Sequence, residues 1–280
     1  MKEMYPNTVV FSSDELRKEL YGDETDQTHN EEVFKELHKR IKNALLSQEY
    51  GLVIYDACNI NYKRRMEFLS QIRHIECKKI AVVIATPFMK CLQNDLNRER
   101  KVGNDVIYRM YKNIYIPQTF EGFDNVNIFY NNGYNNLLLF EELTDIEQDN
   151  PHHTLSVKNH CLKAYEYLKE HYLNTSQELQ IATLYHDIGK LYTKTFKNTK
   201  GEITEVAHFY GHENASAYEA MFMLDVISSN DVLQVILYIQ WHMIDFKGLS
   251  EKRDKYYANL LGEENRKNIA LLHEADINGR

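Results

Sequence analysis

The pattern of apolar residues changes near residue 148, and this change constrains the fold more than any other feature of the sequence. Before it, short apolar runs alternate with segments of helical periodicity, and the runs cover 8–11, 51–56, 79–85 and 126–130. Strands that alternate with helices indicate right-handed crossover connections and a parallel sheet. After Pro151 the apolar residues recur only at helical spacing, over about 155–172, 176–189, 212–225, 229–246, 252–261 and 265–277. The sequence therefore predicts an α/β domain over residues 1–147 and an all-α bundle over residues 148–280.

Helix signals separate the predicted strands of the α/β domain. Ser12 and Glu15 have the spacing of a capping box, which predicts a helix that begins there and runs through Leu20. Further helices are predicted over 31–47 and about 61–74, and two more flank the basic segment 97–101.

Composition limits the classes of protein to which the chain can belong. The net charge of -8 gives no general electrostatic attraction to nucleic acid, so any such contact needs a local basic patch. No run of about 18 apolar residues exists, and the N-terminus lacks the apolar core of a signal peptide. The four cysteines have no CxxC spacing, which is typical of reduced thiols. We therefore expect a cytoplasmic protein without a membrane partner.

The segment Leu184–Lys190 places a histidine and an aspartate side by side, with a lysine three residues later. Apolar residues precede the pair, which indicates a buried helix whose polar end faces a cleft. A buried His186–Asp187 pair is costly unless a charge compensates it, and a metal ion is the usual compensation. The dipeptide alone is weak evidence for a metal site, so other ligand-type residues have to support it.

Histidines are concentrated in the predicted bundle, because nine of the twelve lie between residues 152 and 273. Several fall on or near the apolar faces of different predicted helices, and a bundle can bring such residues together in its core. The candidate metal ligands, in chain order, are His160, His186, Asp187, His212, His242 and Asp276.

This order of residues resembles that of the HD superfamily of metal-dependent phosphohydrolases, over about residues 150–280. Three segments around the ligands are also similar to that family, namely Asn150-Pro151-His152-His153, His186–Lys190 and His208–Glu213. They resemble the HD modules of bacterial CCA-adding enzymes and of some nucleic-acid end-processing kinases. The resemblance implies a single-metal core of His160, His186, Asp187 and Asp276, with His212 and His242 as the extra ligands of two-metal members.

The chemistry of these residue types agrees with a hydrolytic metal site. Imidazoles with carboxylates suit Mn, Fe, Co, Ni or Zn, so we expect one or two divalent transition-metal ions. Such an ion lowers the pKa of bound water and makes hydroxide available at neutral pH. Asp187 is expected to ligate and to bridge two ions, and Lys190 to offset the charge of a bound phosphate. His208 lies four residues before His212 and could take its place.

The first half resembles P-loop polynucleotide kinases over about residues 5–130, through Phe11–Arg17 and Ile54–Asn59. The resemblance implies that Asp14 is the base that acts on the accepting hydroxyl and that Arg17 lies near the accepting phosphate. Asp56 and Arg98 are the other substrate-binding candidates, and Arg98 opens a basic segment that resembles the lid of this family.

The phosphate loop of these kinases is absent from the sequence. The family needs G-x-x-x-x-G-K-[ST] to surround the phosphates with backbone N–H groups, and the only Gly-Lys pair here is Gly189-Lys190. Six residues precede Asn7, too few for a strand and a phosphate loop. We therefore expect an incomplete kinase-like domain that lacks its first strand and is inactive as a kinase. Either the chain begins after the phosphate loop because its start is shortened, or the domain is degenerate.

Together these features predict a metal-dependent phosphohydrolase. Its substrate is expected to be a phosphomonoester or cyclic phosphate on a nucleotide or a nucleic-acid end, and the pairing with a kinase-like domain suggests RNA end repair. Two alternatives stay open: a nucleotidase for free mononucleotides, and a non-catalytic protein that binds a nucleotide or a strand end. The sequence leaves the oligomeric state unknown.

Overall fold

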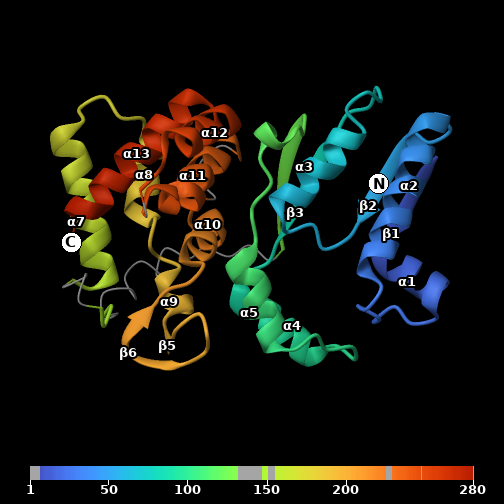
Figure 1. Ribbon diagram of the computed structural model, residues 1–280, viewed down its shortest axis with the longest axis horizontal. Coiled ribbons are helices and arrows are strands. Elements are labelled where there is room, and N and C mark those ends of the chain that lie inside the picture. The colour runs from blue at the N-terminus through green and yellow to red at the C-terminus, as the bar shows by residue number, and fades with distance from the viewer. Residues whose placement is uncertain (1–6, 132–146, 151–154, 225–228, 247, 280) are drawn as a thin grey trace. The chain divides into compact units, whose positions relative to one another are not determined.

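The computed structural model describes residues 7–131, 147–150, 155–224, 229–246 and 248–279 (Figure 1). Two compact units make up the chain: Met1–Lys79 with Glu121–Asp124, and Ile80–Phe120 with Asn125–Arg280. The strands of the α/β half therefore fall into different units. The expected boundary between residues 147 and 148 keeps them together, and it stays a prediction.

The first unit is a small α/β structure. Its strands β1 (Thr8–Ser12) and β2 (Leu52–Asp56) run parallel, with Thr8 opposite Leu52 and Ser12 opposite Asp56. Its helices are α1 (Ser13–Tyr21), α2 (Asn30–Ser47) and α3 (Tyr62–Gln71). The apolar sides of these helices form one core of Leu16, Val33, Leu37, Ile41, Phe68, Leu69, Ile72 and Ile75.

The capping box predicted for the first helix is wrong. Ser12 does stand at the N-terminus of α1 with extended backbone angles, but its side chain makes no capping hydrogen bond. Ser12 is also the last residue of β1, and its pairing opposite Asp56 fixes the direction of its side chain. Asp14 and Glu15 lie in the first turn, where their charges are favourable near the positive end of the helix dipole.

The second unit contains the other parallel pair, β3 (Ile80–Ala85) and β4 (Asn125–Tyr130). A parallel α/β arrangement is thus confirmed, although the described strands form two separate two-stranded parallel sheets. On β3, alternate side chains are buried, whereas Ile80, Val82 and Ile84 are exposed. The strand predicted over residues 79–85 is therefore confirmed, and its alternating burial shows that one face of it is covered.

The remainder of the second unit is mostly helical. The helices are α4 (Phe88–Asn97), α5 (Asn104–Asn113), α7 (Val157–His171), α8 (Gln177–Tyr185), α9 (Lys190–Thr193), α10 (His212–Met223), α11 (Ser229–Trp241), α12 (Glu251–Leu261) and α13 (Glu263–Asn278), with 3₁₀ turns η1 (Thr119–Glu121) and η3 (His242–Asp245). Figure 1 shows α7, α8, α11 and α13 packed side by side. α10 is buried along its length, which explains its apolar residues on every side. No helix in the described part of the chain has the length and apolar character of a membrane span.

A β-hairpin interrupts the helices, contrary to the prediction that no strand follows Pro151. Its strands are β5 (Thr195–Lys197) and β6 (Ile203–His208), which pair antiparallel. β5 has only three residues, and polar residues of the turn surround it, so no apolar alternation marks it in the sequence. Gly201, with φ of 84°, provides the left-handed position that the turn requires.

Residues 80–120, called here the 80–120 segment, are bonded to the HD-like helices through buried polar groups. The Tyr111 hydroxyl donates to Glu219 on α10 at 2.7 Å. The Gln240 side chain on α11 accepts from the Ile116 N–H at 3.0 Å and donates to the Ile114 carbonyl at 2.8 Å. Gly211, with φ of 77°, also packs here, since a Cβ on it would lie 2.5 Å from the Lys112 carbonyl oxygen. The helical part therefore depends on this segment for partners of its buried polar groups.

Because Glu219 is buried at its bond to Tyr111, the stability of the folded chain should depend on pH. Burial raises the pKa of Glu219 to about 7, although the hydrogen bond from Tyr111 acts in the other direction. Between its ordinary value of 4.5 and about 7, the folded chain holds a proton that the unfolded chain has lost, so stability decreases as the pH rises through this window. The loss is on the order of 3 kcal/mol. Glu219→Gln is expected to remove it, as measured by urea unfolding at pH 5 and pH 8. Equal pH dependence in wild type and variant would contradict this assignment.

Candidate metal centre

The six candidate ligands come from five different parts of the helical unit. His160 lies in α7, and His186 and Asp187 follow the last residue of α8. His212 is the first residue of α10, His242 the first of η3, and Asp276 lies near the end of α13. All six side chains are buried, and His160, His186 and His242 have no exposed surface.

Their ligand atoms form two groups that share Asp187. The first group is His160, His186, Asp187 and Asp276, and the second is Asp187, His212 and His242. Within each group the ligand atoms lie within 4.8 Å of one another. The structure thus brings together all six residues that the sequence singled out.

In the first group, Nε2 of His160 is the central atom. It lies 3.0 Å from Oδ1 of Asp276, 3.2 Å from Oδ2 of Asp187 and 3.2 Å from Nε2 of His186. Nε2 of His186 lies 3.5 Å from the same Asp187 oxygen and 3.7 Å from Oδ1 of Asp276. Two nitrogens and two carboxylates therefore face one point from different elements.

The second group uses the other oxygen of Asp187. Nε2 of His212 lies 3.1 Å from Oδ1 of Asp187, and Nε2 of His242 lies 3.9 Å from that atom. Because Oδ2 faces the first group and Oδ1 the second, Asp187 has the position of a bridging carboxylate.

The four histidine rings share one hydrogen-bonding pattern. In each ring Nδ1 lies within hydrogen-bond distance of a backbone carbonyl, and the partners are Gly279, Thr183, Phe209 and Ile239 in chain order of the rings. A carbonyl only accepts, so Nδ1 carries the proton and Nε2 of the neutral ring carries a lone pair. All four Nε2 atoms are therefore placed as ligands, in the way that outer partners orient metal-binding histidines.

The charges of the centre favour a cation. Despite burial, Lys190 and the neighbouring histidines hold the pKa of Asp187 well below its usual range. His160 and His186 do the same for the pKa of Asp276, again against burial. Burial lowers the pKa of His160, but the carboxylates of Asp187 and Asp276 outweigh it and raise that pKa to about 9. Both carboxylates therefore stay negatively charged, and they favour the positively charged form of His160.

His242 behaves differently from His160. Burial, with His186 and His212 nearby, lowers the pKa of His242 to about 3, so the ring stays neutral. Its buried Nε2 has no hydrogen-bond partner in the described part of the chain. A buried lone pair without a partner is costly, and a metal ion would satisfy it. Together with two carboxylates and three further imidazoles, this donor set fits a divalent transition metal.

Glycine at position 189 brings the His186–Lys190 segment close to α10. A Cβ on Gly189 would lie 2.3 Å from the Ser216 nitrogen and 2.5 Å from the His212 carbonyl oxygen. The Gly189 N–H also donates to the Ser216 hydroxyl at 2.8 Å. This close approach places Asp187 beside His212, and any larger residue at position 189 would separate them.

Lys190 lies at the centre but already has protein partners. Its buried ammonium donates to Oδ2 of Asp187 at 2.6 Å and to Oε1 of Gln148 at 2.8 Å, and it lies 5.3 Å from the centre of the Phe209 ring. Sequence reasoning missed Gln148, because no local pattern connects residues 42 positions apart.

The other histidines of the bundle that the structure describes do not belong to either group. His208 lies at the end of β6, stacked on Tyr210, so among the described residues it is His212 that reaches Asp187. His171 bonds the Tyr167 carbonyl, and His273 lies on α13. His152 and His153, part of the segment that resembles the HD superfamily, lie outside the described residues.

Three of the kinase-like candidates lie in the first unit. Arg17 is buried and bonds Asp14 at 2.7 Å and Asn30 at 2.8 Å. Asp56 is the exposed last residue of β2, opposite Ser12, which directly precedes the helix of Asp14. The structure thus joins Asp14 and Arg17 as a pair, and it places Asp56 at the same end of the two strands.

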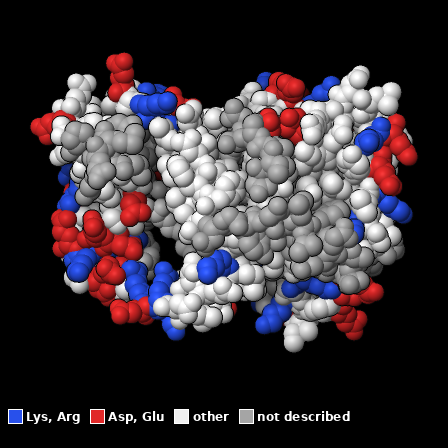
Figure 2. Space-filling view, turned by 180° about the vertical axis from the view of Figure 1, so that it is seen from behind, with Lys and Arg blue, Asp and Glu red and all other residues white. Residues whose placement is uncertain are grey.

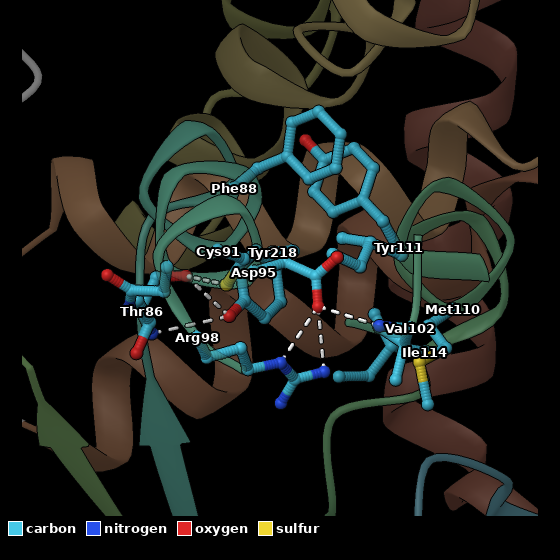
Figure 3. Close-up of a pocket in the computed structure, with 12 residues that line it drawn as sticks. Thr86, Phe88, Cys91, Asp95, Arg98, Val102, Met110, Tyr111, Ile114 and Tyr218 are labelled. Atoms are coloured by element: carbon cyan, nitrogen blue, oxygen red, sulfur yellow. Dashed lines mark hydrogen bonds and ion pairs between the residues drawn. The ribbon is translucent and has the colours of Figure 1, made fainter. Parts of the chain in front are cut away.

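Arg98 lies in the second unit, at a cavity of about 320 Å³ (Figure 3). Its guanidinium bonds the buried carboxylate of Asp95, which also accepts the N–H groups of Val102 and Gly103. The stacked rings of Phe88 and Tyr111 form an apolar wall of this cavity. None of the six metal-site residues lines this cavity, and Arg98 pairs with the carboxylate that holds the segment after α4.

Comparison with protein families agrees with the two predicted resemblances. Residues 2–115 match the family model described as an AAA domain, and residues 152–276 match the one described as an HD domain. The predicted order, a kinase-like domain followed by an HD domain, is confirmed. The HD domain family consists generally of metal-dependent hydrolases. No curated protein sequence matches the chain.

Proposed function

We propose that this chain, with its HD domain match over residues 152–276, hydrolyses a phosphomonoester or cyclic phosphate on a nucleotide or a nucleic-acid end. One observation carries the proposal. Four buried imidazoles direct Nε2 toward the carboxylates of Asp187 and Asp276, and Nε2 of His242 has no hydrogen-bond partner among the described residues. A pure binding protein has no need for such a costly cluster.

The residues of the chain have distinct tasks in this reaction. A divalent cation held by the two groups would supply a Lewis acid that polarises a phosphoryl oxygen and activates water. Asp187 holds both groups together through its two oxygens, and the backbone carbonyls keep the imidazoles in position. Lys190 adds a fixed positive charge beside Asp187, which favours the negative charge that develops on the phosphoryl group.

The substrate class rests on the kinase-like match and on charge. Nucleotides and strand ends are the substrates that a domain of this kind suggests, and its pairing with an HD domain suggests RNA end repair. On the face in Figure 2, Lys and Arg are interspersed with Asp and Glu over the described residues. On this face (Figure 2), the mixture does not favour electrostatic binding along a strand. We propose further that the kinase-like domain, without a phosphate loop in this sequence, adds no phosphoryl transfer.

The test is metal analysis of the purified chain together with a phosphate-release screen. The substrates are an RNA with a 3'-phosphate, an RNA with a 2',3'-cyclic phosphate, and a nucleoside monophosphate, each with Mn²⁺ or Zn²⁺. Release from the RNA ends supports end processing, and release from the mononucleotide alone supports a nucleotidase. A chain that contains bound metal but processes none of these substrates would leave only the binding-protein alternative.

The variant His242→Ala is expected to distinguish the contribution of the second ligand group from that of the first. It removes a ligand of the second group and none of the first, so bound metal should fall from two ions to one. Phosphate release should fall by roughly 10²-fold, the factor that one preorganised charge contact contributes. The control is His208→Ala, which changes a histidine outside both groups and should keep both ions. Loss of metal in His208→Ala and not in His242→Ala would reverse this assignment.

A further inference from the structure

The amide of Gln148 bridges Lys190 to the chain segment that precedes α7. Oε1 of Gln148 accepts from the Lys190 ammonium at 2.8 Å, and Nε2 donates to the Leu155 carbonyl at 3.2 Å. Gln148 has 1% of its surface exposed and Lys190 has 4%, so water does not replace either bond. Both partners leave only one orientation for the amide, because an ammonium only donates and a carbonyl only accepts.

Further bonds hold Gln148 in place from both sides. The Lys194 side chain forms an ion pair with Asp149 and donates to the Glu147 carbonyl. The Asn150 side chain donates to the Ala207 carbonyl at 3.1 Å, and the Ala207 N–H donates to the Asp149 carbonyl at 2.9 Å. Residues 147–150 are therefore fixed to α9 and β6, and the Gln148 oxygen is a fixed acceptor.

Among the described residues, the Lys190 ammonium has two hydrogen-bond acceptors, one charged and one neutral. One is the Asp187 oxygen that also faces His160 and His186, and the other is the neutral Gln148 oxygen. Without the amide, Asp187 would be the one hydrogen-bond acceptor left to the buried ammonium among the residues that the structure describes. The ammonium would then compete with any cation for the same carboxylate.

We propose that Gln148 is a positioning residue of the centre. It holds the Lys190 ammonium between Asp187 and a neutral acceptor, so that the Asp187 carboxylate is free to bind a cation and the ammonium can face the phosphoryl group. This inference rests on the proposed function, and it adds a residue outside the ligand set that acts through Lys190.

A double-mutant cycle with Lys190 tests the proposal, with the full chain loaded with Mn²⁺. Lys190→Met should slow phosphate release by roughly 10²–10³-fold. Gln148→Met should slow it by about 10–100-fold, the usual cost of losing a group that orients a metal-site residue. If Gln148 acts through Lys190, the double variant should match Lys190→Met within about threefold. Effects that multiply would overturn the proposal.

Mn²⁺ affinity provides a second measurement that does not depend on catalysis. By titration calorimetry, Gln148→Met should weaken Mn²⁺ binding about tenfold in the wild-type background and by less than about twofold in the Lys190→Met background. Equal weakening in both backgrounds would show that Gln148 acts independently of Lys190 and would overturn the proposal.

A matched variant separates positioning from general packing. Gln118 is also a buried glutamine, and it donates to the Leu233 carbonyl at 3.1 Å, outside both metal groups. Gln118→Met should lower the melting temperature as Gln148→Met does, but leave the rate and Mn²⁺ affinity of the folded chain unchanged. Similar losses in both variants would reduce Gln148 to a packing residue. A wild-type chain that neither binds Mn²⁺ nor releases phosphate would overturn the proposed function itself. The variants test only the role of Gln148, so the two failures are distinguishable.

Discussion

Replacing Asp187 with asparagine is expected to remove both metal ions and reduce phosphate release to background. Oδ2 of Asp187 faces the first group and Oδ1 the second, so this single side chain belongs to both. Asparagine keeps the shape but loses the charge and one acceptor oxygen. A bound cation contributes several kcal/mol to stabilising the transition state, and each 1.36 kcal/mol is a factor of ten in rate. We therefore expect a decrease of about 10³-fold or more.

Metal content and phosphate release should be measured on the same preparations of wild type and Asp187→Asn. The control is Asp254→Asn, which neutralises an exposed carboxylate of α12 that pairs with Arg266. This control should keep both ions and full activity. Retention of full activity in Asp187→Asn would exclude the hydrolase function proposed for this centre.

Removing the 80–120 segment is expected to prevent stable folding of the helical part. The fragment 148–280 would leave buried Glu219 without Tyr111, and Gln240 without the backbone of Ile114 and Ile116. Asn214 would lose its bond to the Lys112 carbonyl. A hydrogen bond contributes about 0.5–1.5 kcal/mol net, so the loss of these four bonds costs roughly 2–6 kcal/mol, and the apolar surface that packs against the segment is exposed as well. Together these losses are comparable with the whole stability of a domain, about 5–15 kcal/mol.

Two fragments allow this to be measured. The fragment 80–280 keeps the segment and should unfold cooperatively and bind Mn²⁺, whereas 148–280 should do neither. Thermal unfolding by circular dichroism and titration calorimetry provide the two readouts. Cooperative unfolding of 148–280, at a melting temperature near that of 80–280, would instead support the boundary predicted between residues 147 and 148.

Local sequence patterns predicted the helices well. The helix predicted over 155–172 is α7 (Val157–His171), and that over 212–225 is α10 (His212–Met223). Such elements are visible because burial of one face imposes a repeat on neighbouring residues. The hairpin β5–β6 was missed, since β5 has only three residues and the apolar residues of β6 do not alternate regularly with polar ones.

The sequence by itself determined the ligand types, their order and the resemblance of the second half to the HD domain, because these depend on residue identity along the chain. Only the tertiary structure decided which of His208 and His212 lies beside Asp187, since the turn before α10 sets the direction of each ring. It also decided that Lys190 bonds Gln148 and that Tyr111 bonds Glu219, across 42 and 108 residues. Periodicity reports only whether a position is buried, whereas the partner of a buried polar group depends on how distant elements pack.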